Sequence, residues 1–129
     1  MTVPVDVELE LIGRAAARWP DAVVRDELDN NLGDELPTIQ IEVLGGDDDG
    51  FRLDRVLVDI NVYAATRGDA LALAGEVHLW MLHEVRASTS ATAVIGRTGT
   101  ITRPAIRPYT NTGLRRAGAT YEVFNHPVS

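Results

Sequence analysis

Two stretches of alternating residues, followed by an amphipathic helix, constrain the fold more than any other feature of this sequence. Residues 39–43 and 56–64 place an apolar side chain at every second position, which is typical of strands with one buried and one wetted face. Residues 67–86 predict the clearest helix, which begins after Thr66, three residues before Asp69, at the spacing of a capping box. Its apolar stripe consists of Ala70, Leu73, Ala74, Val77, Trp80, Met81 and Val85.

The other predicted elements are shorter or less regular. Residues 4–19 begin with strand-like alternation, but Val5, Leu9, Ile12, Ala16 and Trp19 also share one helical stripe, and the alanines at 15–17 favour a helix. Residues 20–37 are acidic and contain Pro and Gly, which predicts a long connection with one short strand at 22–25. We expect further strands at 93–95, 100–102 and 117–125, a turn at 96–99 and a loop at 104–113.

These elements together predict the fold class. Each clear strand has one apolar face and each helix one apolar stripe, and both must be buried against another element. We therefore expect an α+β fold, a two-layer sandwich in which two helices pack on a mostly antiparallel sheet. At 129 residues the chain predicts a single domain spanning 1–129.

A glycine- and aspartate-rich segment lies between the two clear strands and predicts the tip of a hairpin. A calcium loop of the EF-hand type does not fit, because it would need acids where Gly45 and Val56 stand. Successive carboxylates cannot be buried without partners, so we expect residues 45–52 to be an exposed, mobile loop that faces a partner or the lumen of an assembly. Its candidate interface residues are Asp47, Asp48, Asp49 and Arg52.

Composition narrows the classes of function. The chain has no cysteine, which excludes disulfides, thiol nucleophiles and thiolate metal sites. It contains no apolar run near the roughly 18 residues that span a bilayer, and its first residues are acidic where a signal peptide is basic. We therefore expect a protein made in the cytoplasm.

The charge is unevenly distributed along the chain. Residues 1–64 hold 15 acids and 5 arginines, whereas residues 65–129 hold 4 acids and 7 arginines. This division, −10 against +3, is compatible with a simple solvated acidic face. It is also the pattern of a subunit with opposite charge on two surfaces, suited to head-to-tail contact. The net charge of −7 argues against nucleic acid as a general partner.

No catalytic constellation is visible in the sequence. His78 and His83 lie five residues apart on the predicted helix, so they diverge by about 140° and cannot share a metal. No nucleophile elbow, zinc-protease motif or phosphate-binding glycine loop occurs. We therefore expect no enzyme activity, no cofactor and no metal, and structural or solvent-exposed roles for the histidines.

One basic cluster stands out in the second half of the chain. Arg107, Tyr109, Arg115 and Arg116 lie within ten positions, with Arg103 just before them. Arginine with an aromatic can contact single-stranded nucleic acid, but both residue types are also enriched in protein interfaces. In an acidic chain we interpret the cluster as an assembly surface that meets the acidic half of a neighbouring subunit.

Several segments together resemble a known family. They are PTIQIEVLGG at 37–46, DRVLVDINVYAATRGDALALAGEVHLWML at 54–82, RPYTNTGLRRAGATYEV at 107–123, and the acidic first helix. Their order and spacing are similar to those of the tail terminator proteins of tailed phages. The resemblance implies an α+β sandwich whose subunits form a hexameric ring. It also implies that the ring is assembled in the host cytoplasm and lies in the neck of the finished virion. That ring would cap the tail tube, end its polymerisation and join tail to head, with DNA passing through its lumen. The family has no catalytic residues to carry over.

Two other classes remain open from the sequence. A head-closure or head–tail connector protein of the same phage neck would share most of these features. A small acidic protein-binding module, such as an inhibitor whose carboxylates mimic nucleic acid, would explain the net charge and would be monomeric.

Overall fold

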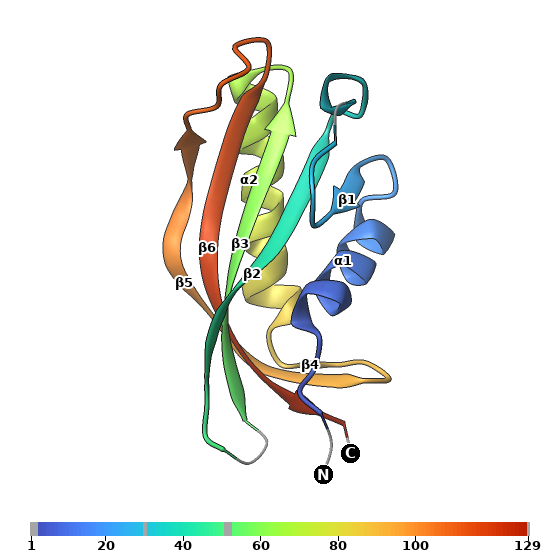
Figure 1. Ribbon diagram of the computed structural model, residues 1–129, viewed down its shortest axis with the longest axis vertical. Coiled ribbons are helices and arrows are strands. Elements are labelled where there is room, and N and C mark those ends of the chain that lie inside the picture. Colours follow the sequence, from blue (N-terminus) through green and yellow to red (C-terminus); the bar gives the residue numbers. More distant parts are fainter. Residues whose placement is uncertain (1–2, 30, 51–52, 129) are drawn as a thin grey trace.

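The computed structural model describes residues 3–29, 31–50 and 53–128, which form one mixed α/β fold of six strands and two helices (Figure 1). The sheet order is β1-β2-β3-β6-β5-β4, and all neighbours are antiparallel except β1 and β2. The elements in chain order are α1 (Val7–Arg18), β1 (Val23–Arg25), β2 (Thr38–Asp48), β3 (Asp54–Ala64), α2 (Arg67–Trp80), β4 (Ser88–Thr89), β5 (Ala93–Arg107) and β6 (Arg115–Pro127).

The mostly antiparallel sheet with two helices is as predicted, but the flat two-layer sandwich is not. The sheet curls into a half-barrel around the helices (Figure 1). β5 shifts register against β6 between Ile95 and Arg97, between Thr100 and Thr102, and between Thr102 and Ala105, and β2 shifts once against β3. Each such bulge bends its strand and increases its twist, which curls the sheet.

α2 begins and packs as the sequence predicts. The Thr66 side chain accepts a hydrogen bond from the Asp69 amide, and the predicted stripe is buried except Leu73, which is half-buried. At its end the helix widens into a π-helical turn, Met81–Val85. The carbonyl oxygen of Met81 there accepts a hydrogen bond from the Thr98 hydroxyl of β5 at 2.6 Å, which fixes the end of the helix to the sheet.

α1 is a helix as predicted, but its buried face matches the predicted stripe only in part. The Asp6 side chain caps it by accepting from the Leu9 amide. The fully buried residues within the helix are Val7, Leu11 and Ala15. Of the predicted stripe, Trp19 at the helix end is buried and Ile12 is half-buried, whereas Leu9 is 67% exposed. Both stripes are apolar in the sequence, so only the docking of the helix against the sheet decides which one is covered.

The sheet edges also differ from expectation. The predicted short strand at 22–25 is present as β1, but β5 is one continuous strand, not two strands joined by a turn at 96–99. Gly96 and Gly99 lie within it: Gly99 pairs with Glu122 of β6, and Gly96 stands at the first register shift. The strand ladder of the β2–β3 hairpin continues to Asp48 and Asp54, so the predicted loop is shorter than 45–52, and the hairpin projects from the body of the sheet (Figure 1).

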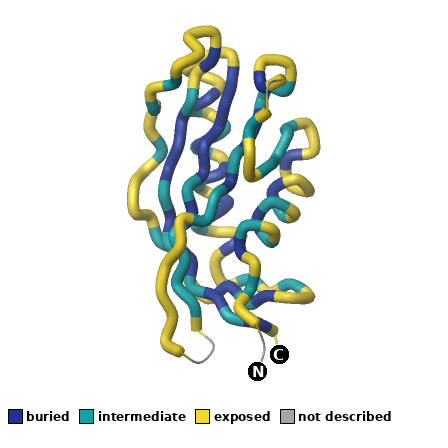
Figure 2. The backbone as a smooth tube through the Cα atoms, viewed as in Figure 1, coloured by how far each residue is buried: buried dark blue, intermediate teal, exposed yellow. Residues whose placement is uncertain are grey.

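The buried core lies between the helices and the sheet, where the inward side chains of β2, β3 and β6 meet α1 and α2. Figure 2 marks the buried stretches of these strands and helices along the backbone. A second, smaller cluster lies on the other face and joins Leu32, Tyr63 and Leu114. No helix among the described residues is long and apolar enough to cross a bilayer.

Candidate functional site

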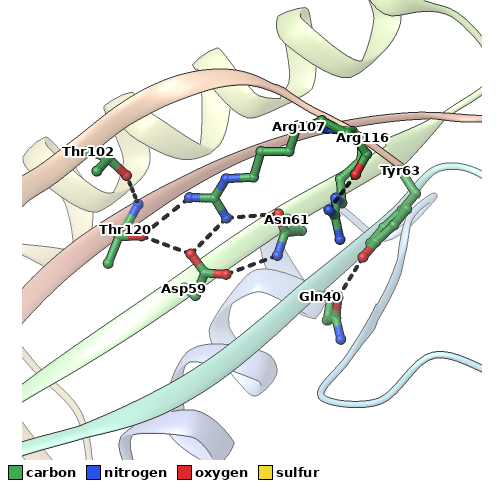
Figure 3. A network of polar contacts seen from close by, with 9 residues as sticks. Gln40, Asp59, Asn61, Tyr63, Thr102, Arg107, Arg116 and Thr120 are labelled. Carbon is green, nitrogen blue, oxygen red and sulfur yellow. Dashed lines mark hydrogen bonds and ion pairs between the residues drawn. The ribbon is translucent and has the colours of Figure 1, made fainter. Parts of the chain in front are cut away.

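Arg107, at the end of β5, reaches across the helix-free face of the sheet (Figure 3). Its Nη1 donates to Asp59 Oδ1 at 2.8 Å and to Asn61 Oδ1 at 3.0 Å, and its Nη2 donates to Thr120 Oγ1 at 3.3 Å. Asp59 also accepts from the Thr120 hydroxyl at 2.8 Å and from the Asn61 amide at 3.1 Å. The guanidinium of Arg107 therefore joins β3, β5 and β6 in one polar network.

Gly118 of β6 makes room for this network. A Cβ atom at position 118 would lie 2.2 Å from Asn61 Oδ1 and 2.6 Å from Arg107 Nη1. Real Cβ atoms do not approach other heavy atoms so closely, so the guanidinium can cross the strand only where no side chain stands. The absence of a side chain at Gly118 and the position of the Arg107 guanidinium therefore depend on each other.

Arg116 and Tyr109 pack together beside this network. The Arg116 guanidinium carbon lies 5.4 Å from the centre of the Tyr109 ring, and its Nη2 donates to the Pro108 carbonyl oxygen at 2.5 Å. The Tyr109 ring meets that of buried Tyr63 edge to face at 5.2 Å. The Tyr63 hydroxyl donates to Gln40 Oε1 at 2.8 Å (Figure 3), and burial raises the pKa of that hydroxyl.

Arg115 is the exposed member of the predicted basic cluster. Its Nη1 donates to the carbonyl oxygens of Thr112 and Leu114, at 2.8 and 3.1 Å, and it makes no ion pair with a described residue. The structure thus brings the four predicted residues together at the β5–β6 connection. Two of them, Arg107 and Arg116, are held by contacts within the subunit, which leaves Arg115 facing solvent.

The predicted acidic residues lie at the other end of β3. Asp47 and Asp48 stand in the projecting hairpin, Asp49 at its tip, and Arg52 lies outside the described residues. The Asp47 side chain is 72% exposed and its Oδ2 lies 4.0 Å from Arg55 Nη1. Because β3 pairs with β6 along its whole length, the acidic hairpin and the basic cluster lie at opposite ends of the molecule.

Carboxylates of the hairpin accept hydrogen bonds from backbone amides within the hairpin itself. Asp48 Oδ1 accepts from the Gly50 amide at 2.8 Å, and Asp49 Oδ1 accepts from the Leu53 amide at 3.2 Å. Burial and the neighbouring charges of Asp48 and Asp49 raise the pKa of Asp54. Among the described residues no group of His, Cys, Asp and Glu has the geometry of a metal site.

A polar pair of buried Tyr121 and half-buried His78 lies on the helix side of the sheet. His78 Nδ1 lies 2.9 Å from the Tyr121 hydroxyl, and Tyr121 is fully buried. Burial raises the pKa of Tyr121, and burial together with the positive charges of Arg103 and His83 lowers the pKa of His78. The His78 imidazole therefore binds a proton more tightly in the unfolded chain than in the folded one. The fold loses stability as the pH falls below about 6.5, because His78 then gains a proton more readily in the unfolded state.

We predict that Tyr121→Phe lowers the free energy of unfolding by about 1–2 kcal/mol, because His78 loses its buried partner while the ring still fills its site. Urea denaturation at pH 7 measures this change. The control is Tyr109→Phe, since the Tyr109 hydroxyl makes no hydrogen bond with a described residue, and it should leave stability within about 0.5 kcal/mol. Equal stability of the two variants would contradict a structural role for the pair.

Two arginines of β5 are exposed but were not among the predicted interface residues: Arg103, which the sequence places just before the basic cluster, and Arg97, which sequence reasoning missed. The signal was present in the charge pattern: residues 85–121 contain six arginines and no acid. Comparison with known proteins finds no protein-family model and no curated protein that matches this chain.

Proposed function

We propose that this chain is a phage tail terminator, the subunit of a hexameric ring that caps the tail tube, ends its polymerisation and joins tail to head. The segments that resemble this family support the proposal, because they are neighbours in space. They comprise α1, β2, β3 with α2, and the β5–β6 connection with most of β6. β2, β3 and β6 are adjacent strands, and α1 contacts β2.

The placement of charge carries the proposal. The acid-free stretch 85–121 supplies β4, β5 and the first half of β6, which form one side of the sheet. The segment 20–37, with six acids and one arginine, supplies β1 at the opposite side. A subunit with opposite charge at opposite sides favours heterologous, head-to-tail contacts, which close into a ring when the rotation permits.

We predict closed rings of about six copies in the purified protein at high concentration and low salt, or on tail tubes when these are added. Sedimentation velocity and negative-stain electron microscopy measure the assembly. The functional assay adds the protein to polymerising tail-tube protein, and growth should stop with one ring at one end of each tube.

The outcomes separate the classes of function. A protein that stays monomeric at millimolar concentration, with and without tubes, contradicts the proposal and favours an acidic binding module. Rings that bind head connectors and leave tube growth unchanged contradict it in favour of a head-closure protein.

A further inference from the structure

β5 forms an open edge of the sheet over most of its length. One side of β5 pairs with β6. On its other side β4 pairs only with its start, through Ser88 with Ile95 and Thr89 with Val94, and no described strand lies on that side from Arg97 onward. Three register shifts and Pro104 interrupt its row of backbone donors and acceptors, as in edges that are protected against strand addition. The edge therefore suits contact by side chains and not extension of the sheet by another strand.

The side chains of this edge are basic. Arg97 and Arg103 are exposed, and neither makes an ion pair with a described residue. The Arg97 guanidinium carbon lies 5.8 Å from the centre of the Phe124 ring, which orients it on the surface. Ile101, between the two arginines, is 49% exposed and adds an apolar contact. No carboxylate of β5 offsets this charge, because residues 85–121 contain none.

The opposite edge of the sheet is acidic. β1 pairs with β2 alone, and it is followed directly by exposed Asp26 and Glu27. The one arginine of this segment, Arg25, is already neutralised, since it lies 2.7 Å from Asp29 and 3.1 Å from Glu35. Neither Asp26 nor Glu27 makes an ion pair with a described residue, so both charges are available to a partner.

These two edges lie on opposite sides of one sheet (Figure 1). We propose that the partner of the basic β5 edge is a second copy of this chain, whose acidic β1 edge meets it through Asp26 and Glu27 against Arg97 and Arg103. The inference rests on the proposed ring and names the surface that closes it. Because the two patches differ and lie on opposite sides, the contact is heterologous and can repeat from subunit to subunit. Charge complementarity of this kind fixes the register and direction of assembly.

The contact differs from the one that the basic cluster of the sequence suggested. Arg107 already pairs with Asp59, and Arg116 packs on Tyr109 and bonds to a carbonyl oxygen, so reversing either charge would also disturb the fold. Arg97 and Arg103 make no ion pair or side-chain hydrogen bond with a described residue, and we expect their replacement to have little effect on the subunit itself.

Charge reversal of each edge tests the proposal. The basic-edge variant carries Arg97→Glu and Arg103→Glu, and the acidic-edge variant carries Asp26→Arg and Glu27→Arg. In either variant alone, like charges face each other at every contact, and we expect the dissociation constant to rise about tenfold or more. In an equimolar mixture every contact is complementary if the variants alternate, which a six-membered ring allows. The mixture, and a single chain with all four changes, should form rings again.

Sedimentation velocity across a salt series, with circular dichroism to verify folding, measures the result. Wild-type rings should weaken as salt rises, because exposed charges are screened over about 8 Å at physiological ionic strength. The neutral variant Arg97→Gln with Arg103→Gln should weaken association less than the charge reversal does, and it serves as the second test if a reversed chain fails to fold.

The outcomes distinguish this inference from the proposed function. Rings formed by each single-edge variant as readily as by the wild type overturn the edge assignment and leave the ring function standing. A wild-type chain that never assembles, even on tail tubes, overturns the function and this inference together. Salt-sensitive binding of a DNA duplex by a monomeric wild type, lost in the basic-edge variant, would overturn the inference in favour of a nucleic-acid surface.

Discussion

Replacing Gly118 with alanine is expected to destabilise the fold by about 3 kcal/mol or more, the upper range for overpacking at a tightly packed position. The new methyl group would meet Asn61 Oδ1 at 2.2 Å and Arg107 Nη1 at 2.6 Å. Asn61 is only 5% exposed and has little room to move. The guanidinium would have to leave the face of the sheet, which breaks its ion pair with Asp59. Chemical denaturation monitored by circular dichroism measures the loss.

The matched control is Gly13→Ala on the exposed side of α1. A Cβ atom there meets nothing within 4 Å, and a helix interior favours alanine over glycine by about 0.5–1 kcal/mol. The same substitution should thus have opposite signs at the two positions. Arg107→Ala combined with Gly118→Ala should cost less than the two separate changes added, because both remove the same contact. A Gly118→Ala protein as stable as the wild type would refute this account of the network.

The second large effect is expected for Trp80→Ala, which should cost about 3–5 kcal/mol. Trp80 is 4% exposed at the end of α2, and its ring meets that of Trp19 edge to face at 5.2 Å. Removing the indole leaves a cavity beside the Trp19 ring, inside the core between the helices and the sheet. Thermal unfolding measures the effect as a lower melting temperature.

Leu79→Ala is the control for this position. Leu79 is adjacent in sequence but 58% exposed, so its truncation should change the free energy of unfolding by about 0.5 kcal/mol at most. Comparable losses at positions 79 and 80 would mean that the helix is turned differently on the sheet. The stability of each variant also matters for the assembly assays, because a weakened ring reports on an interface only if the subunit remains folded.

The elements that were predicted well are those whose pattern is strong and local. In β3, Val58, Ile60 and Val62 are buried on the helix side as their alternation indicates. In α2, the cap at Thr66 and the apolar stripe both follow from side chains within a few residues of one another. For such segments the local preference and the tertiary environment agree, so the sequence alone is sufficient.

The predictions that were wrong concern segments whose local sequence favours one structure while their tertiary contacts impose another. Gly96 and Gly99 suggest a turn, but both lie within β5: Gly96 stands at a register shift, and Gly99 pairs with Glu122 of β6. A Cβ atom there would lie 3.1 Å from the Glu122 side chain, which binds Arg55 across the sheet. The glycine therefore gives space to a neighbouring side chain within a strand, a role that no nearby residue reveals.

The predicted interface residues were likewise partly accessible to sequence reasoning and partly not. The sequence showed that acids gather in the first half and arginines in the second, which is a property of the chain. It could not show that Arg107 and Arg116 are engaged within the subunit, because their partners Asp59 and Tyr109 are brought to them by strand pairing and by a loop.

By itself, then, the sequence determined the element types over most of the chain, the mostly antiparallel sheet with two helices, and the division of charge, since periodicity and composition are local quantities. Only the tertiary structure decided the curl of the sheet, the buried face of α1 and which arginines remain free. These depend on contacts between residues far apart in the chain, such as Gly118 with Asn61 and Arg107, or Trp19 with Trp80. It is also the strand order that turns a charge gradient along the chain into an acidic edge at β1 and a basic edge at β5, on opposite sides of one subunit.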